Sequence, residues 1–177
     1  KTRLIFADQT KDIRFEDGVL VDTLYPFTQV FNAEEGDTNN ASIVMKISFG
    51  REDILMTGDL EEEGEMALLK ATRSMKNALL DAEVLKVGHH GSGGSSSAEF
   101  IKAVSPDIAV ISVGANNTYG HPHRQTLARL AGRGVKVLRT DRDGRIELVF
   151  SKDALVAVSS TRTMSAPNER SFSSKRS

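Results

Sequence analysis

Short apolar runs predict the strands of this chain, because they end at turn residues and are too brief for helices. Such runs occupy Gly18–Pro26, two stretches within Ala41–Asp59 on either side of a turn at Gly50–Asp53, Ala82–Gly88, and Asp107–Gly114. The last patterned segment, Lys136–Phe150, predicts a hairpin with Asp143-Gly144 in its turn.

Three segments with apolar residues near helical spacing predict helices at Leu60–Leu80, Ala98–Val104 and His121–Gly134. The first has acidic residues in its first turn, the second follows a capping-box pattern that begins at Ser96, and the third has Pro122 in its first turn. Strands and helices therefore follow the order β, β, β, α, β, α, β, α, β, β. This order predicts an α/β domain in which helices cover sheets.

The length of the chain and its polar segments predict one domain over residues 1–158. Within it, the polar and turn-rich segment Val30–Asn40 predicts a surface loop. Residues 159–177 are rich in Ser and Arg and nearly without apolar residues, which predicts a disordered or variable tail.

The composition is that of a soluble globular protein and restricts the chemistry. Lys and Arg number 23 against 24 Asp and Glu, a net charge of −1, which gives no general attraction to nucleic acid or to an anionic membrane. The absence of cysteine excludes disulfides and thiolate metal ligands. No apolar run approaches the roughly 20 residues that span a bilayer, so we expect a soluble, cytoplasmic chain with no membrane segment.

Asp59 follows an apolar run and a glycine, so its carboxylate is expected at the carboxyl end of a strand. A functional carboxylate is one interpretation. The other is an N-cap for the helix at Leu60–Leu80, a position that Asp often occupies. This segment alone favours neither.

The adjacent histidines His89 and His90 also end an apolar strand. Neutral imidazoles bind divalent metals, and the flanking Gly88 and Gly91 permit the backbone bends that aim a ring inward. The loop Ser92–Ser97 then precedes a helix, whose free N–H groups attract anions such as phosphate. The alternative is a pair of surface histidines in a flexible linker, which the buried strand before them and the capping box after them oppose.

A third polar cluster, Asn116–His123, again follows a strand. His121 and His123 suit phosphate binding or proton transfer near neutral pH, since histidine ordinarily titrates at about 6.5. Taken alone, they are slightly better explained as helix-start histidines held by Pro122. The three clusters nevertheless converge: Asp59 and all four histidines follow strands, whose carboxyl ends are where sites assemble in open α/β sheets.

Four stretches carry a resemblance to a known family: NNASIVMKISFGREDILMTGDLEEEGE, AEVLKVGHHGS, AVISVGANNTYGHPH and RTDRDGRIEL. The motifs TGD, VGHHGS and NxYGHPH, in this order, resemble the C-terminal half of metallo-β-lactamase-fold hydrolases, most nearly the ComEC-type domain of DNA-uptake competence proteins and its stand-alone relatives. The resemblance runs from about Ile13 to Phe150. It implies an αββα sandwich with a site for two metal ions, usually zinc and alternatively manganese, between the sheets.

The resemblance also implies roles for individual residues. Asp59 matches the bridging carboxylate, and the pair His89-His90 matches the last histidine ligand, with His89 preferred because it lies nearer the strand. Asp59, His89 and His121 would carry catalysis, in which a hydroxide between the metal ions attacks a phosphodiester, with DNA as a candidate substrate. The substrate-binding residues would be Gly91, Ser92, Asn117, Tyr119, His121 and His123.

One departure from the family is large. Its H-x-H-x-D-H motif supplies most metal ligands and has no counterpart here, because no histidine precedes His89. One Asp with one or two His is too few for zinc, which takes three or four protein ligands. The chain is then expected to be a truncated piece without the N-terminal part of the fold, to associate with a chain or segment that carries the motif, or to be a degenerate domain. A ComEC-type context would place it beside a membrane channel.

Three functions are compatible with these patterns. The first is a metal-dependent phosphodiester hydrolase that is incomplete in this chain. The second is a catalytically silent binding or scaffold domain that kept the fold. The third is a metal-free phosphate-binding module built from the loop Gly91–Ser97 and the helix start at His121.

Overall fold

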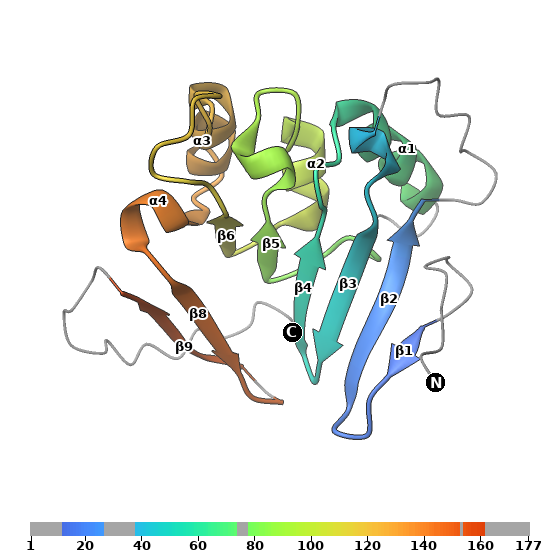
Figure 1. Ribbon diagram of the computed structural model, residues 1–177. Helices are drawn as coiled ribbons and strands as arrows, with labels where there is room; N and C mark the ends of the chain where they lie inside the picture. Colours follow the sequence, from blue (N-terminus) through green and yellow to red (C-terminus); the bar gives the residue numbers. More distant parts are fainter. Residues whose placement is uncertain (1–11, 27–37, 74–77, 153, 162–177) are drawn as a thin grey trace, which may run out of the picture.

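The computed structural model describes residues 12–26, 38–73, 78–152 and 154–161, and its main feature is a seven-stranded sheet (Figure 1). The strands are β1 (Ile13–Arg14), β2 (Val19–Tyr25), β3 (Val44–Phe49), β4 (Glu52–Met56), β5 (Val84–Lys86), β6 (Ile108–Ile111) and β7 (Lys136–Arg139). Their order across the sheet is their order along the chain. β1 to β4 pair antiparallel, and β4 to β7 pair parallel.

Helices cover one face of this sheet. α1 (Glu62–Thr72), α2 (Ala98–Val104) and α3 (Arg124–Ala131) connect the parallel strands, as expected for βαβ crossovers. Alternate strand residues face these helices and join them in one apolar core, which includes Leu55, Leu85, Ala109 and Ile111 from the strands and Leu68, Phe100, Ile101 and Leu130 from the helices. The predicted α/β class is confirmed.

A second, two-stranded sheet covers the opposite face. It is formed by β8 (Ile146–Phe150) and β9 (Leu155–Ser160), which pair antiparallel. The intervening strand residues face this sheet, so that Val84 and Ile108 pack in a second apolar core with Leu155. The layers are therefore helices, large sheet and small sheet, which in the described part of the chain make up three of the four layers of the predicted αββα sandwich.

The prediction of a hairpin at Lys136–Phe150 is wrong. β7 pairs with β6 in the large sheet, the short helix α4 (Thr140–Asp143) follows, and β8 pairs with β9 instead. Side-chain bonds stop β7: the Thr140 hydroxyl bonds both the N–H and the carbonyl of Val113, and the Asp143 carboxylate accepts from the Arg139 N–H. Contacts of this kind leave no periodic pattern in a sequence.

Several predicted boundaries also shift. The first two residues of β4 were expected in a turn, and the first predicted helix begins at Glu62 and its described part ends at Thr72. The third helix begins at Arg124, so that Pro122 precedes it. The predicted tail boundary at Ser159 lies too early, because β9 runs to Ser160.

Parts of two predictions lie outside the described residues: most of the loop Val30–Asn40, whose end is the 3₁₀ turn η1 (Asn39–Ala41), and the tail beyond residue 161. In the described part of the chain, no helix has both the length and the apolar character needed to cross a membrane.

Candidate functional site

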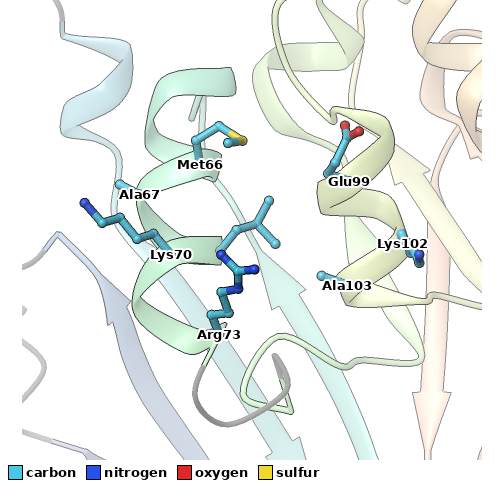
Figure 2. Close-up of a pocket in the computed structure, with 8 residues that line it drawn as sticks. Met66, Ala67, Lys70, Arg73, Glu99, Lys102 and Ala103 are labelled. Carbon is cyan, nitrogen blue, oxygen red and sulfur yellow. The ribbon is translucent and has the colours of Figure 1, made fainter.

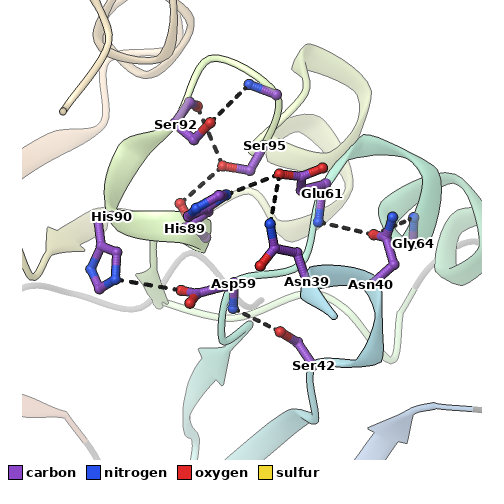
Figure 3. A network of polar contacts seen from close by, with 12 residues as sticks. Asn39, Asn40, Ser42, Asp59, Glu61, Gly64, His89, His90, Ser92 and Ser95 are labelled. Carbon is purple, nitrogen blue, oxygen red and sulfur yellow. Dashed lines mark hydrogen bonds and ion pairs between the residues drawn. The ribbon is translucent and has the colours of Figure 1, made fainter. Parts of the chain in front are cut away.

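Asp59 lies just beyond the end of β4, with its carboxylate turned toward the histidine pair (Figure 3). Its backbone N–H donates to the Ser42 hydroxyl at 2.9 Å. The N-cap of α1 is Glu61, and Asp59 makes no cap, so the capping interpretation is wrong. The Asp59 Oδ1 atom lies 3.7 Å from His90 Nε2, and both side chains are about half exposed, at 44% and 49%.

The two histidines share the tight 3₁₀ turn η3 (Gly88–Gly91) but point to different partners. His89 and His90 both have a positive φ, 43° and 52°, a conformation that non-glycine residues rarely adopt and that is found at functional sites. His89 Nδ1 lies 3.0 Å from Glu61 Oε1, which also accepts from the amide of Asn39 (Figure 3). His90 Nδ1 lies 2.7 Å from the carbonyl oxygen of Ser112.

The bond to Ser112 determines which ring nitrogen of His90 carries a hydrogen. A carbonyl oxygen only accepts, so His90 Nδ1 carries the hydrogen and donates it. In the neutral ring, Nε2 is then a bare acceptor that faces Asp59 Oδ1, which is also an acceptor. Two acceptors opposed across 3.7 Å are stabilised by a positive charge, either a proton on Nε2 or a cation between them. This geometry favours His90 as the partner of Asp59, whereas the sequence-based preference was His89.

His121 joins this cluster from the loop after β6. The centroid of its ring lies 5.5 Å from that of His89, and the ring of Tyr119 lies 6.0 Å from that of His121. Burial, together with the neighbouring charges of His89 and His90, lowers the pKa of His121 below its ordinary value, which favours the neutral ring. Three strand ends therefore meet here, as the sequence predicted.

His123 is the predicted site residue that the structure places elsewhere. It is the N-cap of α3, where its Nδ1 accepts from the Gln125 N–H at 3.4 Å, and its backbone N–H donates to the Gly91 carbonyl. The alternative that His123 is a helix-start residue is favoured for this histidine.

The loop Gly91–Ser97 is fixed by two charged side chains that the sequence gave no reason to single out. The Glu65 carboxylate, 1% exposed as a residue, accepts from the backbone N–H groups of Ser96 and Ser97. The Arg129 guanidinium donates to the carbonyls of Gly93, Ser95 and Ser96. The flexible-linker alternative is therefore wrong.

Glu65 also bears on the predicted phosphate cradle. The N–H groups of Ser96 and Ser97, just before α2, already bond this internal carboxylate, and the Phe100 N–H donates to the Ser97 hydroxyl. Ser92 is likewise engaged: its hydroxyl accepts from Gly94 N–H, and its carbonyl accepts from the Thr126 hydroxyl. The arrangement disfavours a metal-free phosphate module at this loop.

A pocket of about 420 Å³ opens beside the histidines. It is lined by His90, Ser112, Val113, Gly114, Asn117, Tyr119, His121 and Thr140. His90 belongs both to this pocket and to the pair with Asp59, so a ligand bound at the pair would reach the pocket directly.

A larger pocket, about 830 Å³, lies between α1 and α2 (Figure 2). Its walls carry Met66 and Ala103 as apolar surface and Lys70, Arg73 and Lys102 as cations. None of the predicted site residues lines it, so it is separate from the candidate site.

The described residues do not form a complete metal centre. Among them there is no group of three or more His, Asp, Glu or Cys side chains close enough to hold an ion. Asp59 and His90 offer two ligands, whereas zinc takes three or four from the protein. This part of the chain does not fit a metal ion held by its own residues alone.

Comparisons with known proteins agree with the fold. Residues 11–115 match the family model described as the metallo-beta-lactamase superfamily, whose members generally bind metal ions. The chain is 45% identical over 109 residues to ComE operon protein 3 of Bacillus subtilis (strain 168). The aligned region covers 62% of this chain and 13% of that protein. It is 38% identical over 121 residues to competence protein ComA of Neisseria gonorrhoeae, covering 68% of this chain and 17% of that protein.

A third relative is recombination protein 2 of Haemophilus influenzae, 32% identical over 129 residues, or 73% of this chain and 15% of that protein. The chain therefore matches less than a fifth of the length of these relatives. The matched family model spans more than half of the chain, and the relatives include competence proteins, as the motifs predicted. The chain belongs to the metallo-β-lactamase superfamily.

Proposed function

We propose that this chain supplies part of the active site of a metal-dependent phosphodiester hydrolase, with DNA as the candidate substrate. The observation that carries the proposal is the Asp59–His90 pair, in which Asp59 Oδ1 lies 3.7 Å from His90 Nε2. One of the relatives, ComA of Neisseria gonorrhoeae, is named a competence protein, which fits a context of DNA uptake. Further ligands, carried by a segment outside the described residues or by a partner chain, would complete the site.

Neighbouring side chains support this role for the pair. The Ser112 carbonyl orients the His90 ring through Nδ1, and Glu61 with Asn39 orients His89. Such outer contacts are typical of histidines that present a nitrogen to a cation. The His121 ring lies 5.5 Å from that of His89, and one of its ring nitrogens can carry an N–H for a substrate oxygen.

Hydrolysis of bis-p-nitrophenyl phosphate in the presence of Mn²⁺ or Zn²⁺ tests the proposal. We expect little turnover from the chain alone and increased turnover after mixing with a polypeptide that bears the H-x-H-x-D-H motif. Asp59→Asn should abolish the gain, while the matched change Glu63→Gln, at an exposed carboxylate on α1, should not. Turnover that survives Asp59→Asn would refute the role of the pair.

A catalytically silent scaffold is the second candidate, favoured by the incomplete ligand set among the described residues. The same mixing experiment separates it from the hydrolase. A scaffold gives no turnover in any mixture and binds the motif-bearing polypeptide without a requirement for metal.

A further inference from the structure

Tyr119 is the most exposed large apolar side chain recorded in the described part of the chain, with 83% of its surface open, although it lines the pocket beside His90. The only other tyrosine, Tyr25, is 5% exposed and lies in the core. An exposed aromatic ring at the mouth of a pocket offers a flat face that loses unfavourable water contact when a planar ligand covers it.

The loop that carries Tyr119 is held in place before any ligand arrives. The Asn117 amide donates to the carbonyls of Gly114 and His121, at 3.1 and 2.9 Å, and its oxygen accepts from the His121 N–H at 3.0 Å. These bonds close the turn around Tyr119, so stacking on its ring does not have to order the loop. A preorganised platform loses less conformational entropy on binding than a flexible one.

The polar groups around the ring are already engaged with the chain's own backbone. The Thr140 hydroxyl donates to the carbonyl of Val113 and accepts from its N–H. The Asn117 side-chain amide donates to the His121 carbonyl and accepts from the His121 N–H, and His90 Nδ1 bonds the Ser112 carbonyl. Little remains on these three side chains to bond the edge of a base, and the His121 ring, which also lines the pocket, is the one assigned above to a substrate oxygen of the phosphodiester. The pocket therefore suits a ligand held by its flat face rather than by its edge.

We propose that Tyr119 is a stacking platform for an unpaired nucleobase of the substrate, and that this pocket binds bases without reading their identity. The inference rests on the proposed function, in which the phosphodiester lies at the Asp59–His90 pair. His90 belongs to both places, so the neighbouring base of the same strand reaches the Tyr119 ring. A base must leave its partner strand to stack on a side chain, so the ligand is a single strand or a frayed end.

Binding of a thymidine hexamer with a central 2-aminopurine tests this, measured by anisotropy and by the quenching of 2-aminopurine emission on stacking. EDTA is present, so that binding is measured without hydrolysis. Loss of one stacked base typically weakens binding roughly 5- to 150-fold, which is the effect we expect for Tyr119→Ala. Tyr119→Phe keeps the ring and should keep both the quenching and the affinity to within about threefold.

Phe15→Ala is the matched control, because it also removes an exposed aromatic ring, 53% exposed, but next to the far edge strand β1. It should leave binding unchanged, and all three variants should unfold at nearly the wild-type temperature. Hexamers of dA, dC and dT should bind with affinities within about threefold of one another, whereas edge recognition would separate them by roughly 5- to 150-fold.

The inference is overturned if wild-type protein does not bind the hexamer, if Tyr119→Ala binds as wild type does, or if one base is strongly preferred. Its failure is distinct from that of the proposed function. Hydrolysis of bis-p-nitrophenyl phosphate by the wild-type mixture, and its loss in Asp59→Asn, tests the hydrolase without any use of Tyr119. Persistent hydrolysis without hexamer stacking would refute only the inference, and stacking without hydrolysis would refute only the hydrolase.

Discussion

The buried carboxylate of Glu65 provides a sharp test of how the loop Gly91–Ser97 is held in place. In Glu65→Ala the backbone N–H groups of Ser96 and Ser97, both in buried residues, lose their acceptor. Each buried donor left unsatisfied costs about 1–3 kcal/mol, and removal of a buried charge returns part of that cost. We therefore expect Glu65→Ala to lower the free energy of unfolding by about 2–4 kcal/mol.

Glu65→Gln separates the hydrogen bonds from the loss of side-chain volume. The Gln side chain keeps one oxygen acceptor and presents an NH₂ group to the other N–H, so the expected loss is about 1–3 kcal/mol. Glu63→Gln on the same helix changes an exposed carboxylate and should alter stability by no more than about 0.5 kcal/mol. Urea unfolding followed by circular dichroism measures all three variants.

The pH dependence of the Glu65 effect follows from its burial. Burial raises the pKa of Glu65 above its ordinary value of 4.5, against the opposing N–H donors of Ser97 and Ser96. A raised pKa means that the carboxyl contributes most stability below pH 4.5 and less as the pH rises through the folded pKa. The cost of Glu65→Ala should thus be larger at pH 4 than at pH 7. A cost below about 0.5 kcal/mol at both values would refute the argument.

Three further predictions concern the turn, the sheet and the metal. Gly91→Ala should cost about 1–3 kcal/mol in urea unfolding, because φ is +84° and the new Cβ would lie 2.6 Å from Pro122 Cβ; Gly94→Ala, with no contact shorter than 3.9 Å, should cost less. Glu52→Gln should raise the thermal unfolding temperature at pH 7, since burial and the charge of Glu83 raise the Glu52 pKa, and the gain should vanish below pH 4.5. Purified chain should hold less than one zinc per molecule by elemental analysis, because the described residues offer too few ligands, and a full equivalent would mean that residues outside the described part complete the site.

The sequence predicted the gathering of Asp59, His90 and His121, because carboxyl ends of parallel strands lie along one edge of a sheet. It could not choose between His89 and His90, since the left-handed conformation of both residues turns their rings in directions that distance along the chain does not reveal. The sequence preferred His89 as the metal ligand; the structure places His90 nearest Asp59, and the choice of ligand stays a prediction.

The contacts that hold the loop Gly91–Ser97 could not be predicted from the sequence either. Glu65 and Arg129 each bond backbone groups more than 30 residues away, and nothing in their local pattern distinguishes them from exposed charges on a helix. The hairpin error has the same origin, because Thr140 stops β7 through bonds to Val113 on a neighbouring segment. Long-range bonds from side chains to the backbone are fixed only when the chain has folded.

The strand order of the large sheet has a consequence for how this chain folds as it is made. Each strand from β2 to β7 pairs with the strand synthesised just before it, so every new segment leaving the ribosome meets a finished edge. The exception is the small sheet, which follows the large sheet along the described chain and covers Val84 and Ile108. Until the small sheet docks, this apolar surface is exposed to solvent. The nascent chain is therefore most prone to aggregate in the interval before β8 and β9 pack on the large sheet.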